Sequence, residues 1–131
     1  MRGELDGDHW VVNGQKIWTS NASEADWMFA LIRTEPEDVA PRHAGISYFL
    51  LDLRQPGVEI RPIKQINGDA EFNETFFTDA TCPEDSLIGA VGDGWKIAMG
   101  LLAFERGVST LGQQMAFRNE LDAIIAASKA N

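Results

Sequence analysis

The sequence has little of what metal centres and thiol chemistry need. Its 131 residues include one cysteine, Cys82, and two histidines, His9 and His43. A single cysteine excludes an internal disulfide and a thiolate metal cluster, and the two histidines lack the spacing of a ligand pair. A nucleophilic cysteine would also need a paired base, so we interpret Cys82 as a structural thiol. We expect no metal site.

Positive charge and long apolar runs are also scarce. The chain has 11 Lys and Arg against 20 Asp and Glu, a formal net charge of −9, which repels nucleic acid and anionic membrane surfaces. The opening "MRGELDGDHW" has no apolar signal core, and no run reaches membrane-spanning length. We therefore expect no nucleic-acid partner, no membrane partner and a cytoplasmic location, which a single cysteine also fits.

The first two thirds of the chain are rich in strand signals. "HWVVNGQKIWTS" contains two β-rich runs joined by Asn13-Gly14, a pair that favours the type I′ turn of a hairpin. Four more strand-like segments follow, separated by turn residues: "DWMFALIRT", "GISYFLLDL", "GVEIRPI" and "EFNETFFTD". This succession predicts a mainly β domain, an antiparallel barrel or sandwich.

After "CPEDSLIGAVGDG" the pattern becomes helical. No proline occurs from Trp95 to Ser128, and apolar residues recur at steps of four and three, which predicts one long α-helix with Asp93 near its N-cap. Such a helix would be roughly 50 Å long, more than a domain of this size can cover. The apolar stripe and the glycines of the helix are Ile97, Leu101, Phe104, Val108, Leu111, Met115, Phe117, Leu121, Ile124 and Ile125, and Gly100, Gly107 and Gly112.

These features predict two parts. Residues 1–92 form the β-domain, and residues 93–131 form the first helix of a bundle that is cut from a longer protein or completed by a partner. The glycines fit close approach of another helix, or a substrate that passes the backbone. The alternative is a helix that frays or breaks at one of them.

The order of five motifs resembles the middle β-domain and the first C-terminal helix of the acyl-CoA dehydrogenases. These motifs are "DGDHWVVNGQKIWTSNASEADW", "RT", "GISYFLLDLRQPGVEIRPI", "EFNETFF" and "GDGWKIAMGLLAFERG", from about Leu5 to Gly112. The resemblance implies FAD, an acyl-CoA thioester that is desaturated between its α and β carbons, and hydride transfer to flavin N5. It also implies reoxidation by an electron-transfer flavoprotein and a homo-oligomer that assembles through helices.

The resemblance also implies which residues form the site. Trp18 matches the aromatic residue beside the isoalloxazine, Ser20 matches the hydroxyl near N5, and Thr19 lies between them. An indole face packs well against a planar heteroaromatic ring, and a hydroxyl can hydrogen-bond the atom that receives hydride. Many relatives have Thr where this chain has Ser20, and either residue supplies the hydroxyl. The resemblance thus implies that the aromatic residue and the two hydroxyls at the end of this strand contact a flavin.

The "AFERG" segment matches the helix that passes the substrate thioester in this family. Ala103, Phe104 and Arg106 are the matching substrate-binding positions. Glu105 matches one of the two places at which the family holds its catalytic base, and the other lies later in the C-terminal domain, outside this sequence. The alternative for Glu105 is a solvated helix carboxylate.

Other functions stay open at this point. The glycine- and serine-bearing flavin stretch that precedes this region in the family is absent from the sequence, so we expect the isolated chain to be inactive. An acyl-CoA oxidase, or a flavin monooxygenase or nitroalkane oxidase of the same superfamily, fits the same motifs. From a different class, a non-catalytic β-module could use the long helix to assemble with partners.

Overall fold

The computed structural model describes residues 1–40 and 42–130, apart from the side chains of residues 107–109. Backbone contacts divide the chain into two compact units, Met1–Ala98 and Met99–Asn131. The elements in chain order are β1 (Arg2–Asp6), β2 (His9–Ser20), β3 (Trp27–Arg33), the 3-10 turn η1 (Arg42–Gly45), β4 (Ile46–Asp52), β5 (Val58–Ile63), β6 (Phe72–Pro83), the 3-10 turn η2 (Glu84–Ser86), β7 (Leu87–Ile88) and α1 (Gly94–Ala130).

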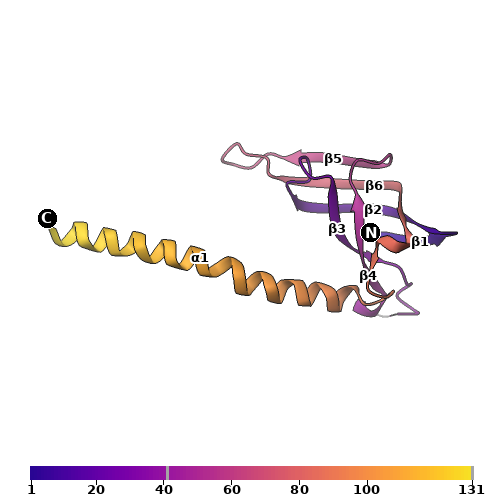
Figure 1. Ribbon diagram of the computed structural model, residues 1–131. Helices are drawn as coiled ribbons and strands as arrows, with labels where there is room; N and C mark the ends of the chain where they lie inside the picture. The colour runs from indigo at the N-terminus through magenta and orange to yellow at the C-terminus, as the bar shows by residue number, and fades with distance from the viewer. Residues whose placement is uncertain (41, 131) are drawn as a thin grey trace. The chain divides into compact units, whose positions relative to one another are not determined.

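The seven strands form one sheet in the order β5-β6-β2-β1-β3-β4-β7. Figure 1 shows β5, β6 and β2 side by side. Neighbouring strands are antiparallel except β1 and β3, which are parallel and share the single pair Arg2 and Arg33. The mainly β fold followed by one helix is confirmed. The sheet is open, however, because β5 and β7 are its two ends in the described part of the chain, and a closed barrel is not formed.

The prediction of a hairpin at Asn13-Gly14 is wrong. Strand β2 continues through these residues, and the register with β6 shifts between Val12 and Gly14, where Gly14 has a φ of +127°. The Asn13 amide donates to the Asp79 carboxylate at 3.0 Å, and its Oδ1 accepts from the Asp79 N–H at 2.9 Å. Asn and Gly tolerate unusual backbone angles in a bulge as well as in a turn, and the cross-strand partner Asp79 favours the bulge here.

The hairpin lies earlier, between β1 and β2. Asp6 pairs with His9, which leaves Gly7 and Asp8 as a two-residue loop. Gly7 has a φ of +65°, the sign that the first position of a type II′ loop requires.

The core lies on one face of the sheet. Val12, Ile32, Phe49 and Leu51 are fully buried, and Trp10 meets Phe49 edge-on, with ring centroids 5.3 Å apart. Alternation along β4 produces this face, since Leu50, between two buried residues, is 40% exposed. Burial thus alternates toward the end of β4, whereas Ser47, Tyr48 and Phe49 near its start are all buried.

Helix α1 is continuous, so the alternative of a break at a glycine is wrong. The Asp93 carbonyl accepts the N–H of Ile97 at 3.1 Å, which makes Asp93 the N-cap residue, as predicted. No helix among the described residues combines the length and the apolar character needed to cross a membrane.

The predicted apolar stripe of α1 is largely uncovered. Phe104 is 78% exposed and Met115 69%, so the described residues do not bury this face. Gly107 and Val108, also part of the prediction, lie outside the residues whose surroundings the structure describes. The other stripe residues that are at least 40% exposed are Leu101, Leu111, Phe117, Leu121, Ile124 and Ile125.

Stability should depend on which face of the sheet loses an aromatic ring. Phe49→Ala removes a fully buried ring, and we expect it to lower the free energy of unfolding by about 3–5 kcal/mol. The matched control is Phe29→Ala on the neighbouring strand: Phe29 is 58% exposed and stacks on Tyr48 at 5.6 Å, so we expect a loss of less than about 1.5 kcal/mol. Urea unfolding followed by circular dichroism measures both, and equal losses would contradict the assignment of the core face.

The buried thiol should make stability fall at high pH. Cys82 is 2% exposed, and desolvation raises its pKa to about 11. Because the folded thiol holds its proton more tightly than the unfolded thiol, its contribution is fully present below the unfolded pKa of roughly 8.5 and is lost as pH rises toward 11.

We expect the difference in unfolding free energy between wild type and Cys82→Ala to shrink from pH 8 to pH 10.5. Iodoacetamide at pH 8 should modify the folded wild type far more slowly than the chain in urea. A pH-independent difference, together with rapid modification of the folded chain, would show that the thiol is accessible.

Candidate functional site

The end of β2 carries a second bulge, and Trp18 lies in it. The register with β6 shifts between Lys16 and Thr19. Trp18 has a φ of +63°, a left-handed conformation that costs a bulky residue of the order of 1–3 kcal/mol. Its side chain is 60% exposed and meets the ring of Phe72 edge-on, with centroids 5.8 Å apart and planes at 80°. The backbone is thus strained at a residue that presents a large aromatic surface to solvent.

Thr19, the next residue, is anchored to strand β6 by two hydrogen bonds. Its carbonyl accepts the Asn73 amide at 3.0 Å, and its Oγ1 receives the Thr75 hydroxyl at 3.3 Å. Asn73 and Thr75 are both fully buried. Ser20, the next residue, is exposed and pairs with Phe72. The structure therefore brings the three predicted cofactor residues together, with Trp18 and Ser20 accessible and Thr19 held inward.

Lys16 adds a half-buried cation next to this bulge. It lies opposite Thr75 on the paired strand, and its Nζ donates to the Leu31 carbonyl at 2.8 Å. Desolvation lowers the pKa of Lys16. Sequence reasoning gave no role to Lys16, because a lysine in a strand is usually solvated. The strand pattern does not signal the bond of Lys16 to the Leu31 carbonyl.

The four predicted substrate and base residues lie together on α1. Ala103, Phe104, Glu105 and Arg106 are consecutive and exposed, and the Arg106 carbonyl accepts the Thr110 hydroxyl at 3.1 Å. They belong to the second unit, whereas Trp18, Thr19 and Ser20 belong to the first. A general base works best in a pocket that excludes water, and the described residues around Glu105 do not form one.

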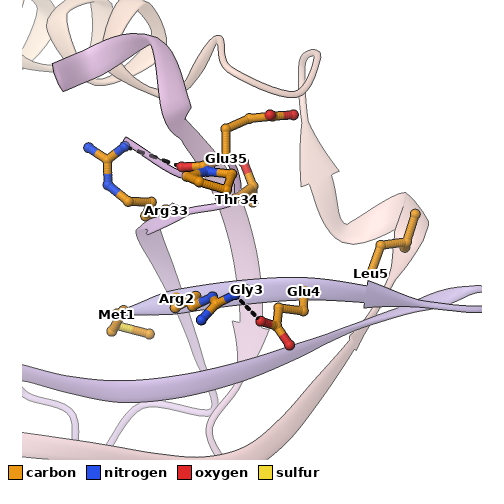
Figure 2. Close-up of a pocket in the computed structure, with 9 residues that line it drawn as sticks. Met1, Arg2, Gly3, Glu4, Leu5, Arg33, Thr34 and Glu35 are labelled. Atoms are coloured by element: carbon orange, nitrogen blue, oxygen red, sulfur yellow. Dashed lines mark hydrogen bonds and ion pairs between the residues drawn. The ribbon is translucent and has the colours of Figure 1, made fainter. Parts of the chain in front are cut away.

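A pocket of about 540 Å³ lies elsewhere, between β1 and the segment that follows β3 (Figure 2). The two strands pair only at Arg2 and Arg33 and then separate, which opens the pocket. An ion pair of 2.5 Å between Arg2 and Glu4 and a hydrogen bond of 3.3 Å from Arg33 Nη1 to the Glu35 carbonyl lie along its walls. No residue predicted from the sequence lines it. We therefore place the candidate site at the Trp18 bulge, where strain and an exposed aromatic ring coincide.

Comparison with known proteins bears on the fold and on this site. The profile of "Acyl-CoA dehydrogenase, middle domain" matches residues 2–80. The acyl-CoA dehydrogenase IpdE1 of Mycobacterium tuberculosis H37Rv is 59% identical over 122 residues, which cover 93% of this chain and 31% of that protein. The chain thus spans about a third of the length of this curated relative.

Two solved structures extend the similarity to the backbone. The Tcur3481-Tcur3483 steroid ACAD superimposes with a TM-score of 0.82 at 32% identity, covering 99% of this chain and 33% of that one. A glutaryl-coenzyme A dehydrogenase in complex with glutaryl-CoA gives a TM-score of 0.69 at 31% identity, covering 76% and 25%. The profile match over more than half of the chain, together with these similar backbones, shows that the chain belongs to the acyl-CoA dehydrogenase family.

Proposed function

We propose that this chain is part of an FAD-dependent acyl-CoA dehydrogenase that introduces a double bond between the α and β carbons of an acyl-CoA thioester. Residues 1–92 are its middle β-domain, and residues 93–131 begin its C-terminal helical domain. The observation that carries the proposal is the exposed indole of Trp18 in a strained bulge, two residues before an exposed hydroxyl, within a chain of this family. Strain of this kind gathers at ligand-binding positions.

The residues of the bulge fit a flavin. Trp18 offers a flat aromatic surface, and the edge contact from Phe72 limits how the indole can turn. Ser20 offers a hydroxyl that can donate to a ring nitrogen. FAD, when bound, supplies the acceptor for the hydride that leaves the substrate β carbon. The chain's own contribution is to orient the ring and to place a hydrogen-bond donor at its edge.

Glu105 is the proposed base that takes the α proton, and Ala103, Phe104 and Arg106 are the proposed substrate contacts. Adjacent helical residues project about 100° apart, so the charges of Glu105 and Arg106 need not meet at one point. Because Glu105 is exposed in the described chain, the enclosing walls must come from other segments. The 131 residues alone are therefore expected to be inactive as an enzyme.

The partners follow from this activity. The substrate is an acyl-CoA, and an electron-transfer flavoprotein reoxidises the flavin. The uncovered stripe of α1, in which Phe104 and Met115 are mostly exposed, supports assembly into a homo-oligomer through helices. The same stripe is the one observation that favours the second candidate, a non-catalytic β-module that assembles through its helix.

Trp18 should matter for FAD binding while an equally exposed tryptophan should not. We expect saturable binding when FAD is titrated into the purified chain, and an affinity loss of about tenfold for Trp18→Ala, the value of roughly 1.4 kcal/mol of aromatic contact. Ser20→Ala should weaken binding less. Trp27→Ala is the matched control, because Trp27 is 54% exposed on β3. Flavin fluorescence gives the dissociation constants.

Equal losses for Trp18→Ala and Trp27→Ala would contradict the site. Absence of binding by a folded, associating chain would mean that other segments complete the flavin site. The same three variants are then compared for flavin content in the full-length enzyme. A lower flavin content in Trp18→Ala than in Trp27→Ala would support the site.

Glu105 should be essential for flavin reduction. In the full-length enzyme, we expect Glu105→Gln to slow reduction of the flavin by acyl-CoA by about 10²–10⁴-fold while flavin content is retained, because the amide cannot accept the α proton. Anaerobic stopped-flow absorbance measures the reduction. Glu120→Gln, an exposed glutamate on the same helix, is the control. Reduction at the wild-type rate would move the base to the later position of the family.

A further inference from the structure

We propose that Asn73 is a positioning residue for the flavin contact: its buried amide holds the Thr19 carbonyl and thereby fixes the bulge that presents Trp18 and Ser20. This inference rests on the proposed function, because it assigns a supporting residue to the same site. Sequence reasoning gave Asn73 no role, since its place in an alternating strand accounts for it.

The geometry around Asn73 is that of a clamp between two strands. Its Nδ2 donates to the Thr19 carbonyl on β2 at 3.0 Å and to the Glu71 carbonyl, just before β6, at 3.2 Å. The residue is fully buried. The Thr19 carbonyl belongs to the peptide unit that joins Thr19 to Ser20, so the amide fixes the direction in which the chain leaves the bulge.

Two neighbouring residues of β6, Phe72 and Asn73, contact this bulge. The ladder resumes after the bulge with Thr19 opposite Asn73 and Ser20 opposite Phe72. Phe72 contacts the indole of Trp18, and Asn73 binds the carbonyl of Thr19. Phe72 and Asn73 therefore restrain the Trp18 side chain and the backbone of the bulge together. A left-handed tryptophan persists only when its surroundings determine it from several sides.

Stability alone does not account for an asparagine at this position. The same face of β6 continues with Phe77, Ala80 and Cys82 in the apolar core. Asn73 Oδ1 is buried and has no hydrogen-bond partner among the described residues, an unfavourable state for a polar atom. An apolar residue of similar size would avoid that unpaired atom but could not hold the Thr19 carbonyl. The amide thus serves the bulge at some expense to the core.

The test follows Trp18 without relying on a flavin. The 131-residue chain is labelled with 5-fluorotryptophan, and Trp18→Phe identifies the fluorine resonance of Trp18 among those of the four tryptophans. Asn73→Asp keeps the shape but removes the amide donor. Asn73→Leu removes the donor and the unpaired Oδ1 together, so that the Thr19 carbonyl loses its side-chain partner. Thr75→Val is the matched control, because Thr75 is equally buried on the same strand and binds the Thr19 hydroxyl rather than its carbonyl.

We expect both Asn73 variants to shift and broaden the Trp18 resonance, while those of Trp10 and Trp95 stay in place and Thr75→Val has a smaller effect. FAD affinity should fall about tenfold in both, which corresponds to about 1.4 kcal/mol of binding free energy. Asn73→Leu should separate positioning from stability, since we expect a small change in its melting temperature and a clear loss of affinity for FAD. If Asn73→Asp fails to fold, the leucine variant carries the test.

An unmoved Trp18 resonance in a folded Asn73→Leu chain would overturn the proposal, and so would an equal shift in Thr75→Val. If the wild-type chain binds no FAD, the fluorine spectrum still decides whether Asn73 controls Trp18. The two failures are therefore distinguishable, because absence of FAD binding by the wild-type chain would mean that other segments complete the flavin site, and it does not bear on the clamp.

Discussion

The pairing of β2 with β6 is the constraint on which the rest of the structure depends. Strand β2 is bonded to β1 on one side and to β6 on the other, so it connects the two halves of the sheet. Its ladder with β6 is interrupted by two bulges. One is fixed by Asn13 and Asp79, and the other holds Trp18 at a positive φ. The first keeps the strands aligned over the core, and the second turns an aromatic ring outward.

The β2–β6 ladder resumes on either side of each bulge, which explains why a regular sheet can present Trp18 to a ligand. A bulge changes the direction of one or two side chains while the ladder resumes on either side. Here Thr19 and Ser20 return to register with Asn73 and Phe72 immediately after Trp18. The cost of the unusual backbone is therefore confined to a short stretch, and the core formed by Val12, Phe49 and their neighbours is not disturbed.

Sequence reasoning recovered the elements better than their connections. Apolar runs predicted β3 and β4, and the spacing of the stripe predicted α1, because the lengths and periods of these patterns are those of strands and helices. The Asn-Gly pair was ambiguous: positive φ serves a turn or a bulge, and only the distant partner Asp79 decides between them. The polarity of Asn73 carried no signal, because a buried amide and a solvated one look alike in a strand. Family resemblance, and not periodicity, pointed to Trp18.

The reciprocal bonds between Asn13 and Asp79 also bear on the chemical stability of the Asn13 side chain. An asparagine followed by glycine is prone to deamidation, in which the following backbone nitrogen attacks the side-chain carbonyl carbon. Both ends of the Asn13 amide are engaged by Asp79, so a rotation of the side chain toward that nitrogen breaks two hydrogen bonds. Once deamidated, position 13 would carry a carboxylate facing Asp79, and like charges at that distance repel. The contact that aligns the two strands thus also protects them chemically, and its loss would be self-reinforcing.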